Sequence, residues 1–296
     1  MHSDLPRFSI VIPTYNRPGP LRQCLLALAA LDYPAECYEV IVVDDGGHGS
    51  LDEAVAGLDT RFRLRSLRQN NAGPGAARNA GAAVADGEYL AFTDDDCRPE
   101  PGWLRAFAVG FAVRPGDLLG GRTLNGLAGN LYSEASQSLQ AWFYDHCAGC
   151  ASPLRFFASN NLGLSTARFR ELGGFDTATL RFASEDREFC GRWLAAGGAL
   201  GYVPDAMVRH YHDLDPVRFW RQHFAYGRGA YRLRLARRRR GLPPLPGDRA
   251  WMWASVSRYP CAEPGPGRKL ALAGLALATH VANLAGYLFE QAHDPT

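Results

Sequence analysis

Residues Tyr89–Asp96 read YLAFTDDD and place three carboxylates directly after a short, mostly apolar run. The run Tyr89–Thr93 predicts a buried strand. Adjacent carboxylates repel one another unless a cation neutralises them, so the triplet Asp94–Asp96 indicates a site for a divalent metal and a diphosphate. The alternative is a solvated acidic turn, because aspartate is common where strands end. The neighbouring segments must distinguish these two interpretations.

Three other strand-like segments precede this strand, and a helical segment follows each of them. We predict strands at Phe8–Ile12, Glu39–Val43, Phe62–Leu67 and Glu88–Phe92, and helices at Leu21–Leu31 and Ala76–Ala85. This alternation predicts an α/β fold with a mostly parallel central sheet, whose ligands gather at the carboxyl ends of the strands. Tyr15, Asp45 and Arg78 fall, like the aspartate triplet, at or just after those ends.

The composition places few limits on function. The 296 residues, 47% of them apolar, can form one large domain with an appendage, and a net charge of +2 points to no particular partner. Seven scattered cysteines are an odd number, which favours a reducing compartment. The first apolar run, Ile10–Pro13, is too short for a signal peptide, so we expect a cytoplasmic protein. Because Lys269 is the single lysine, the arginine bias indicates a GC-rich bacterial genome.

The C-terminal part is strongly basic. Residues Arg209–Arg258 hold twelve arginines and three acidic residues. An amphipathic helix is predicted at Pro216–Arg240, followed by a proline-containing linker at Gly241–Gly247. The basic helix either covers a core with one face in solvent or contacts an anionic lipid surface. No nucleic-acid-binding signature accompanies it, so we expect no nucleic-acid partner.

A last helix is predicted at Arg268–Phe289, and its apolar length is close to that of a membrane span. It nevertheless carries His280 and Asn283. Small residues lie on one face, Gly274, Ala278, Ala282 and Gly286, and bulkier ones on another, Leu277, Val281, Leu284 and Leu288. Three interpretations remain open: a core or homo-oligomer interface helix, a helix on the inner face of the cell membrane, and a membrane span.

Several segments, taken in order, resemble the family-2 glycosyltransferases of GT-A fold. The matching segments are Ser9–Arg17, Val40–Gly46, Gly73–Gly81, Gly87–Asp96, Gly173–Asp176, Ser184–Asp186 and Val203–His210. The resemblance implies a GT-A domain over residues 1–212, with a nucleotide-binding half at 8–100 and an acceptor and catalytic half at 101–212. A helical, basic extension then occupies residues 213–296.

The activity that this resemblance implies is transfer of a sugar, with inversion, from a nucleoside-diphosphate donor to a hydroxyl group. The donor is expected to be a UDP-sugar, and the acceptor a lipid-linked molecule or a polysaccharide. Mg²⁺ or Mn²⁺ would neutralise the leaving diphosphate. The resemblance makes Asp96 the main metal ligand, with Asp94 and His210 as further ligands, and places Asp94 and Asp95 beside the donor.

The resemblance assigns a wider group of residues to binding of the donor nucleotide: Pro13, Tyr15, Asn16, Arg17, Asp45 and Arg78. A carboxylate at Asp45 would accept the imide N–H of a uracil-type base, on which a tyrosine can stack. The alternative for Asp45 is a turn, although Asp44 alone would serve that purpose. Arg78 lies in the first turns of a helix behind a Gly-Pro-Gly loop, which suits a base edge or diphosphate, and its alternative is a surface arginine.

The remaining assignments concern catalysis and the acceptor. Asp186, with Glu185 beside it, matches the catalytic base, although acidic residues also favour helix N-termini. Asn160, Asn161 and His212 are assigned to the acceptor or sugar pocket.

Two other classes of protein remain possible from the sequence. One is another nucleotide enzyme, such as a nucleotidylyltransferase or an NAD-binding oxidoreductase, and the other is a non-catalytic sugar- or nucleotide-binding protein of the same fold. A nucleotidylyltransferase needs a basic, glycine-rich loop where this chain has Pro13–Asn16.

Overall fold

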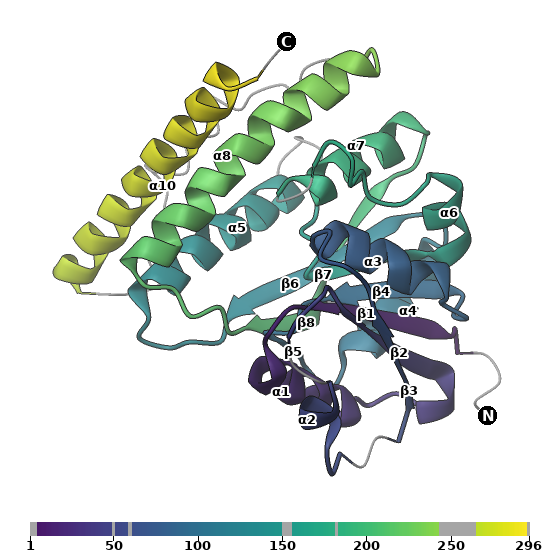
Figure 1. Ribbon diagram of the computed structural model, residues 1–296. Helices are drawn as coiled ribbons and strands as arrows, with labels where there is room; N and C mark the ends of the chain where they lie inside the picture. The colour runs from purple at the N-terminus through teal and green to yellow at the C-terminus, as the bar shows by residue number, and fades with distance from the viewer. Residues whose placement is uncertain are drawn as a thin grey trace. The chain divides into compact units, whose positions relative to one another are not determined.

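The computed structural model describes residues 5–48, 51–58, 61–149, 156–180, 183–242 and 265–294 (Figure 1). The chain divides into two compact units. The first comprises Met1–Leu124, Leu154–Arg181 and Glu185–Tyr211, and the second comprises Asn125–Pro153, Phe182–Ser184 and His212–Thr296. The last segment of the second unit begins at residue 212, close to the predicted start of the C-terminal extension at residue 213. The second unit also includes residues 125–153, which the prediction assigned to the first domain. Most of the predicted linker at Gly241–Gly247 lies outside the described residues.

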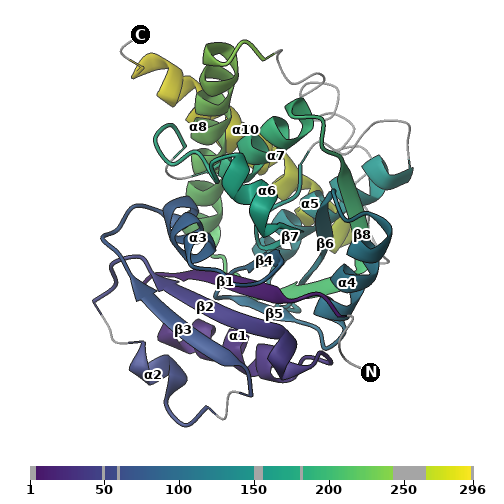
Figure 2. The same cartoon turned by 90° about the vertical axis from the view of Figure 1, so that its right-hand side faces the viewer.

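The first unit is built on an eight-stranded sheet with the order β3-β2-β1-β4-β7-β6-β8-β5 (Figure 2). Its strands are β1 (Phe8–Thr14), β2 (Tyr38–Asp44), β3 (Arg63–Arg68), β4 (Tyr89–Thr93), β5 (Cys97–Pro99), β6 (Leu118–Asn125), β7 (Asn161–Ser165) and β8 (Leu200–His210). Strands β1, β2 and β4 are buried along their whole length, as continuous apolar runs in a parallel sheet predict. Strand β3 carries three arginines and lies at the edge.

The sheet is mixed rather than mostly parallel. Strands β3, β2, β1 and β4 pair in parallel, as predicted. The pairs β4–β7, β6–β7 and β5–β8 are antiparallel, so the prediction is wrong for the second half of the sheet. Three residues, Asp94–Asp96, separate β4 from β5. Such a connection is too short for the crossover that a parallel neighbour requires, and β5 pairs with the distant β8 instead.

Helices follow most of the strands. They are α1 (Pro18–Ala29), α2 (Asp52–Val55), α3 (Pro74–Ala83), α4 (Trp103–Val113), α5 (Leu131–Gly149), α6 (Thr166–Glu171), α7 (Glu185–Ala195), α8 (Pro216–Arg239) and α10 (Pro266–Ala292), with a 3₁₀ turn, η1 (Ala35–Cys37). The helices α1, α3, α8 and α10 each begin at a proline, which is favoured in the first turn because its missing N–H would be unpaired there. Helices α1, α3 and α10 therefore begin two or three residues before the positions predicted from the sequence.

Asn161 ties three elements of the first unit together from the start of β7. Its side-chain amide donates to the carbonyl of Arg122 at 3.0 Å and to that of Ala206 at 2.9 Å. Its Oδ1 accepts the indole N–H of Trp103 at 2.9 Å. Because Asn161 is only 2% exposed, these bonds replace hydration that the core excludes. The side chain predicted for a sugar pocket is fully engaged in the core.

We expect Asn161→Ala to lower the free energy of unfolding by about 3 kcal/mol, because it leaves one donor and two acceptors unpaired in the core. Urea denaturation measures this change. Val113→Ala, at a side chain that is 76% exposed, is the control and should change stability by less than about 0.5 kcal/mol. Equal stability of Asn161→Ala and the control would contradict the assigned structural role.

The second unit contains α5, α8 and α10, and the last two pack closely side by side. A Cβ added at Gly227 would lie 1.9 Å from the carbonyl oxygen of Asn283, and one at Gly286 would lie 2.0 Å from that of Phe224. The predicted small-residue face is thus confirmed at Gly286 and wrong at Gly274, whose Cβ position is open. The helices run parallel, since Phe219 near the start of α8 clusters with Leu272 near the start of α10, and Tyr231 further along α8 donates to Asp294 after the end of α10.

His223 on α8 is buried in this helix pair. Its ring lies 4.4 Å from that of Phe219, and neither ring nitrogen has a hydrogen-bond partner among the described residues. Burial, with a smaller effect of His280, lowers the pKa of His223 to about 4. The imidazole is therefore neutral in the folded protein at physiological pH.

The second unit should lose stability in acid. Between pH 6.5 and about 4 the unfolded chain binds a proton at His223 that the folded chain does not, so unfolding becomes more favourable by about 2 to 3 kcal/mol as the pH falls. Urea unfolding across this pH range measures the effect, and His223→Gln should reduce it. His48→Gln, at an exposed histidine, should leave it unchanged. An unaltered pH dependence in His223→Gln would assign the effect to other groups.

Candidate active site

The aspartate triplet lies between β4 and β5, beside the end of β1. Asp95 and Asp96 are buried, and Asp94 is partly exposed. The Thr14 hydroxyl donates to Asp95 Oδ2 at 2.7 Å. Arg17, in the turn after β1, contacts both buried carboxylates, with Nη1 2.9 Å from Asp95 Oδ1 and Nη2 2.8 Å from Asp96 Oδ2. The guanidinium thus supplies the positive charge that the adjacent carboxylates require.

The two buried carboxylates differ in their affinity for protons. Burial raises the pKa of Asp95 to about 7, with help from Asp96 and against the opposing effects of Arg17 and Thr14. Burial also disfavours charge on Asp96. The hydrogen bond and charge of His210, together with Arg17, outweigh it and hold the pKa of Asp96 well below its usual range. Asp96 is therefore the carboxylate that stays ionised and can bind a cation.

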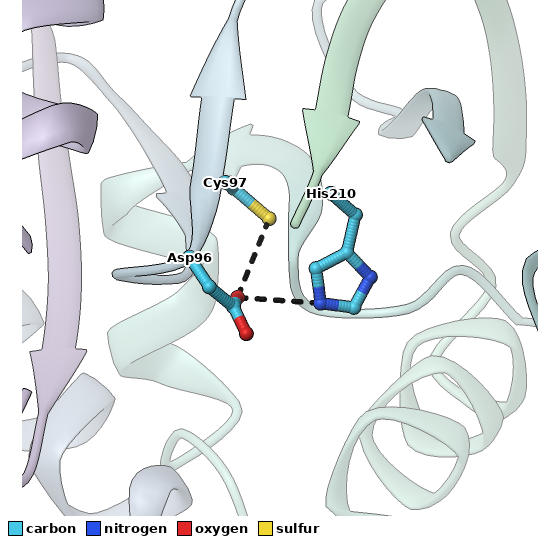
Figure 3. Close-up of side chains that lie close together, drawn as sticks. All are labelled: Asp96, Cys97 and His210. Atoms are coloured by element: carbon cyan, nitrogen blue, oxygen red, sulfur yellow. Dashed lines mark hydrogen bonds and ion pairs between the residues drawn. The ribbon is translucent and has the colours of Figure 1, made fainter. Parts of the chain in front are cut away.

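Asp96, Cys97 and His210 lie close enough together to hold a metal ion (Figure 3). The Nε2 atom of His210 lies 3.2 Å from Asp96 Oδ1, and the Cys97 Sγ atom lies 4.0 Å from the same oxygen. Cys97 and His210 are direct partners in the antiparallel β5–β8 ladder, which brings the end of β8 to the triplet. Carboxylate oxygen and imidazole nitrogen at this spacing suit Mn²⁺ or another divalent first-row metal. Sequence reasoning found Asp96 and His210 but overlooked Cys97.

Asp94 faces another partner. The Nη2 atom of Arg78, on α3, lies 2.5 Å from Asp94 Oδ1, and its Nη1 atom lies 3.1 Å from Glu185 Oε1 at the start of α7. The Arg78 side chain is buried, and its Nε atom has no hydrogen-bond partner in the described part of the chain. Arg78 therefore links the triplet to the acidic start of α7, and its charge is already paired.

Glu185 and Asp186 lie next to each other at the start of α7, where Glu185 is buried and Asp186 is partly exposed. Burial, and then the charge of Asp186, raises the pKa of Glu185 to about 7 although Arg78 opposes it. Burial also raises the pKa of Asp186. The Oδ1 atom of Asp186 accepts the backbone N–H of Arg187 at 2.7 Å. A carboxylate with a raised pKa has the proton affinity that a general base needs.

Of the predicted nucleotide-binding residues, Pro13 is buried within β1, and Tyr15 and Asn16 are exposed in the following turn. The Asn16 side chain accepts the backbone N–H of His48 at 2.7 Å. Asp45 accepts three hydrogen bonds from the segment after β3, from Gln69, Ala72 and Gly73. Asp44 accepts the backbone N–H of Gly47 at 2.8 Å and so forms the turn, as expected. Asp45 orders the neighbouring loop through both of its oxygens.

The three residues predicted for the acceptor pocket, Asn160, Asn161 and His212, are all buried. Asn161 is engaged in the core, and Asn160 is buried, with its Oδ1 atom 3.5 Å from the Thr123 hydroxyl. His212 belongs to the second unit, where its backbone carbonyl accepts the hydroxyl of Ser133 at 2.6 Å.

Solved structures with the same arrangement of strands and helices are glycosyltransferases. The mannosyltransferase PcManGT from Pyrobaculum calidifontis, solved with GDP-Man and Mn²⁺, has a TM-score of 0.65 at 19% identity and covers 97% of this chain and 86% of its own. Staphylococcus aureus TarS 1–349 in complex with UDP has a TM-score of 0.54 at 19% identity and covers 97% and 91%. The fold is therefore of the GT-A type, as predicted.

Residues 9–170, more than half of the chain, match the family described as Glycosyl transferase family 2, and the chain belongs to this family. Glycosyltransferase AglE of Haloferax volcanii is 37% identical over 123 residues, which are 41% of this chain and 40% of AglE. Chondroitin synthase of Escherichia coli is 29% identical over 238 residues, 68% of this chain and 34% of the synthase. The chain thus spans less than half the length of these relatives.

We expect Arg78→Met to lower the free energy of unfolding by about 3 to 5 kcal/mol, because Asp94 and the buried Glu185 lose their shared cation. Denaturant unfolding near neutral pH measures this change. Arg63→Met is a matched control, since that side chain is 61% exposed and its ion pair with Asp86 should contribute less than about 1 kcal/mol. If both variants were equally stable, Arg78 would not be the link between the triplet and α7.

Proposed function

We propose that the protein transfers a sugar from a nucleoside-diphosphate donor to an acceptor hydroxyl with inversion, and that Asp96 and His210 hold a Mn²⁺ or Mg²⁺ ion. The observation that carries this proposal is the pairing of Asp96 with His210, whose Oδ1 and Nε2 atoms lie 3.2 Å apart just after the end of β4. Ligands of α/β proteins collect at such strand ends. The presence of Mn²⁺ and a nucleotide sugar in PcManGT supports the same chemistry here.

The chain's own residues would prepare the donor end of the site. When bound, the cation would neutralise the charge of the departing diphosphate. Arg17 is 43% exposed and already contacts the carboxylates at which that cation would sit. It therefore supplies a second positive charge beside the diphosphate. Asp45 would act through the loop after β3, which it fixes, and the exposed Tyr15 would offer its ring to the nucleobase.

Asp186 is proposed as the general base. It takes the proton of the acceptor hydroxyl while that oxygen forms a bond to the anomeric carbon and the bond to the diphosphate breaks on the opposite face. Glu185 is ion-paired with Arg78 and acts as a positioning residue. Such a single displacement inverts the anomeric centre and needs no protein nucleophile.

The donor base and the acceptor are assigned by class. We favour a UDP-sugar because a UDP complex is known for the similar TarS fold, whereas PcManGT was solved with a GDP-sugar. The acceptor is proposed to be a lipid-linked molecule or a polysaccharide, and the location the cytoplasm or the inner face of the cell membrane.

Two substitutions separate binding from chemistry. Asp96→Ala should abolish the Mn²⁺-dependent thermal stabilisation that UDP-sugars produce, because the ionised ligand is lost. Asp186→Asn should keep this stabilisation and lower the transfer rate by about 10² to 10⁴-fold. In the unmodified protein the rate should rise with pH through a pKa above the usual aspartate value, because burial raises the pKa of the base that must be ionised.

Asp205→Asn, at an exposed position of β8, is the control for both measurements and should behave like the unmodified protein. Normal turnover in Asp186→Asn would reject the base assignment. Metal-independent donor binding in both the unmodified protein and Asp96→Ala would reject the metal site.

A further inference from the structure

One face of α10 is aliphatic and exposed. Its large side chains, here called the leucine face, are Leu270 (76% exposed), Leu277 (56%), Val281 (50%), Leu284 (59%) and Leu288 (52%). They are separated by seven, four, three and four positions, so they lie within about 60° of one side of the helix and extend for about 27 Å. An uncharged stripe of this length is unusual on a surface that contacts only water.

The opposite face of α10, which is mixed apolar and polar, packs on α8 (Figure 1). Glu290 is buried and forms ion pairs with both Arg228 and Arg232 of α8. The buried Gly286 fixes the close approach of the two helices. The helix is long and apolar enough to cross a membrane, but its exposed aliphatic side chains lie on one side. A one-sided apolar helix lies in a membrane interface rather than spanning the bilayer.

The charge of the adjoining segments is positive. Between Pro216 and Arg240 the chain has nine arginines and no acidic residue. Arg268 and Lys269 precede the leucine face in the first turn of α10, and Glu290, the acidic side chain within this helix, is neutralised by its two arginine partners. This distribution complements an anionic surface. A second copy of the same face would bring two strongly basic helix pairs together, which electrostatic repulsion opposes.

We propose that the leucine face binds an anionic lipid membrane and lies parallel to its surface, with the arginines of α8 and the basic start of α10 near the lipid headgroups. Burial of the aliphatic side chains provides the apolar part of the affinity, and each basic residue near the surface adds to it. This inference rests on the second unit alone and does not depend on the proposed transfer reaction.

Vesicle flotation of the full chain tests the proposal, with phosphatidylcholine vesicles prepared with and without phosphatidylglycerol. The unmodified protein should float with the anionic vesicles and should be released by high salt. Leu277→Gln with Leu284→Gln should weaken binding by at least about tenfold. Arg238→Gln with Arg239→Gln should also weaken binding to the anionic vesicles by about tenfold.

A matched control is Val109→Gln with Val113→Gln on α4, where the side chains are 65% and 76% exposed, and this pair should leave binding unchanged. Unfolding temperatures equal to that of the unmodified protein would verify that the leucine variants fold. The proposal is overturned if the protein does not bind anionic vesicles or if the leucine variants bind as well as the control. It is also overturned if sedimentation shows a dimer that the leucine variants dissociate without any vesicle binding.

Discussion

The cost of burying several carboxylates close together governs the first unit. Asp95, Asp96 and Glu185 are buried, and Asp94 is partly so. Uncompensated, such charges would be protonated or would destabilise the fold. The compensation comes from elements far apart in the chain: Arg17 after β1, Arg78 in α3 and His210 at the end of β8. The contacts that offset the cost of burying these carboxylates also decide which of them stays ionised. Stability and chemistry are therefore properties of one network in this protein.

The two halves of the sheet contribute different parts of that network. The parallel half supplies Thr14 and Arg17, which contact Asp95 at the carboxyl ends of the strands, where α/β sheets commonly present ligand-binding groups. The antiparallel half brings in His210, because β5 directly follows the triplet and its antiparallel pairing with β8 sets Cys97 opposite His210. Arg78 then connects the triplet to α7 and its acidic pair. Ion pairs thus hold the aspartate triplet and the acidic start of α7 together.

The sequence predicted the parallel half of the fold well, because β1, β2 and β4 are continuous apolar runs whose burial follows from composition alone. It failed for the antiparallel half, where three-residue β5 pairs with a strand more than a hundred positions away. Asp96 and His210 were found by motif. The ion pairs of Arg78 with Asp94 and Glu185 were not predicted, because no local sequence pattern indicates which carboxylates will pair with a buried guanidinium. The core hydrogen bonds of Asn161 could not be predicted for a similar reason, because they are made to Trp103 and Arg122, which are distant in the sequence.

The pairing of Cys97 with His210 also has a consequence for sequence change in β8. Side chains alternate between the two faces of a strand, so the loss or gain of one residue between Leu200 and His210 would present Arg209 or Tyr211 to Asp96 in place of the imidazole. The sheet could still form with such a slip. The register of β8 against β5 is thus under a constraint that the composition of the strand is not.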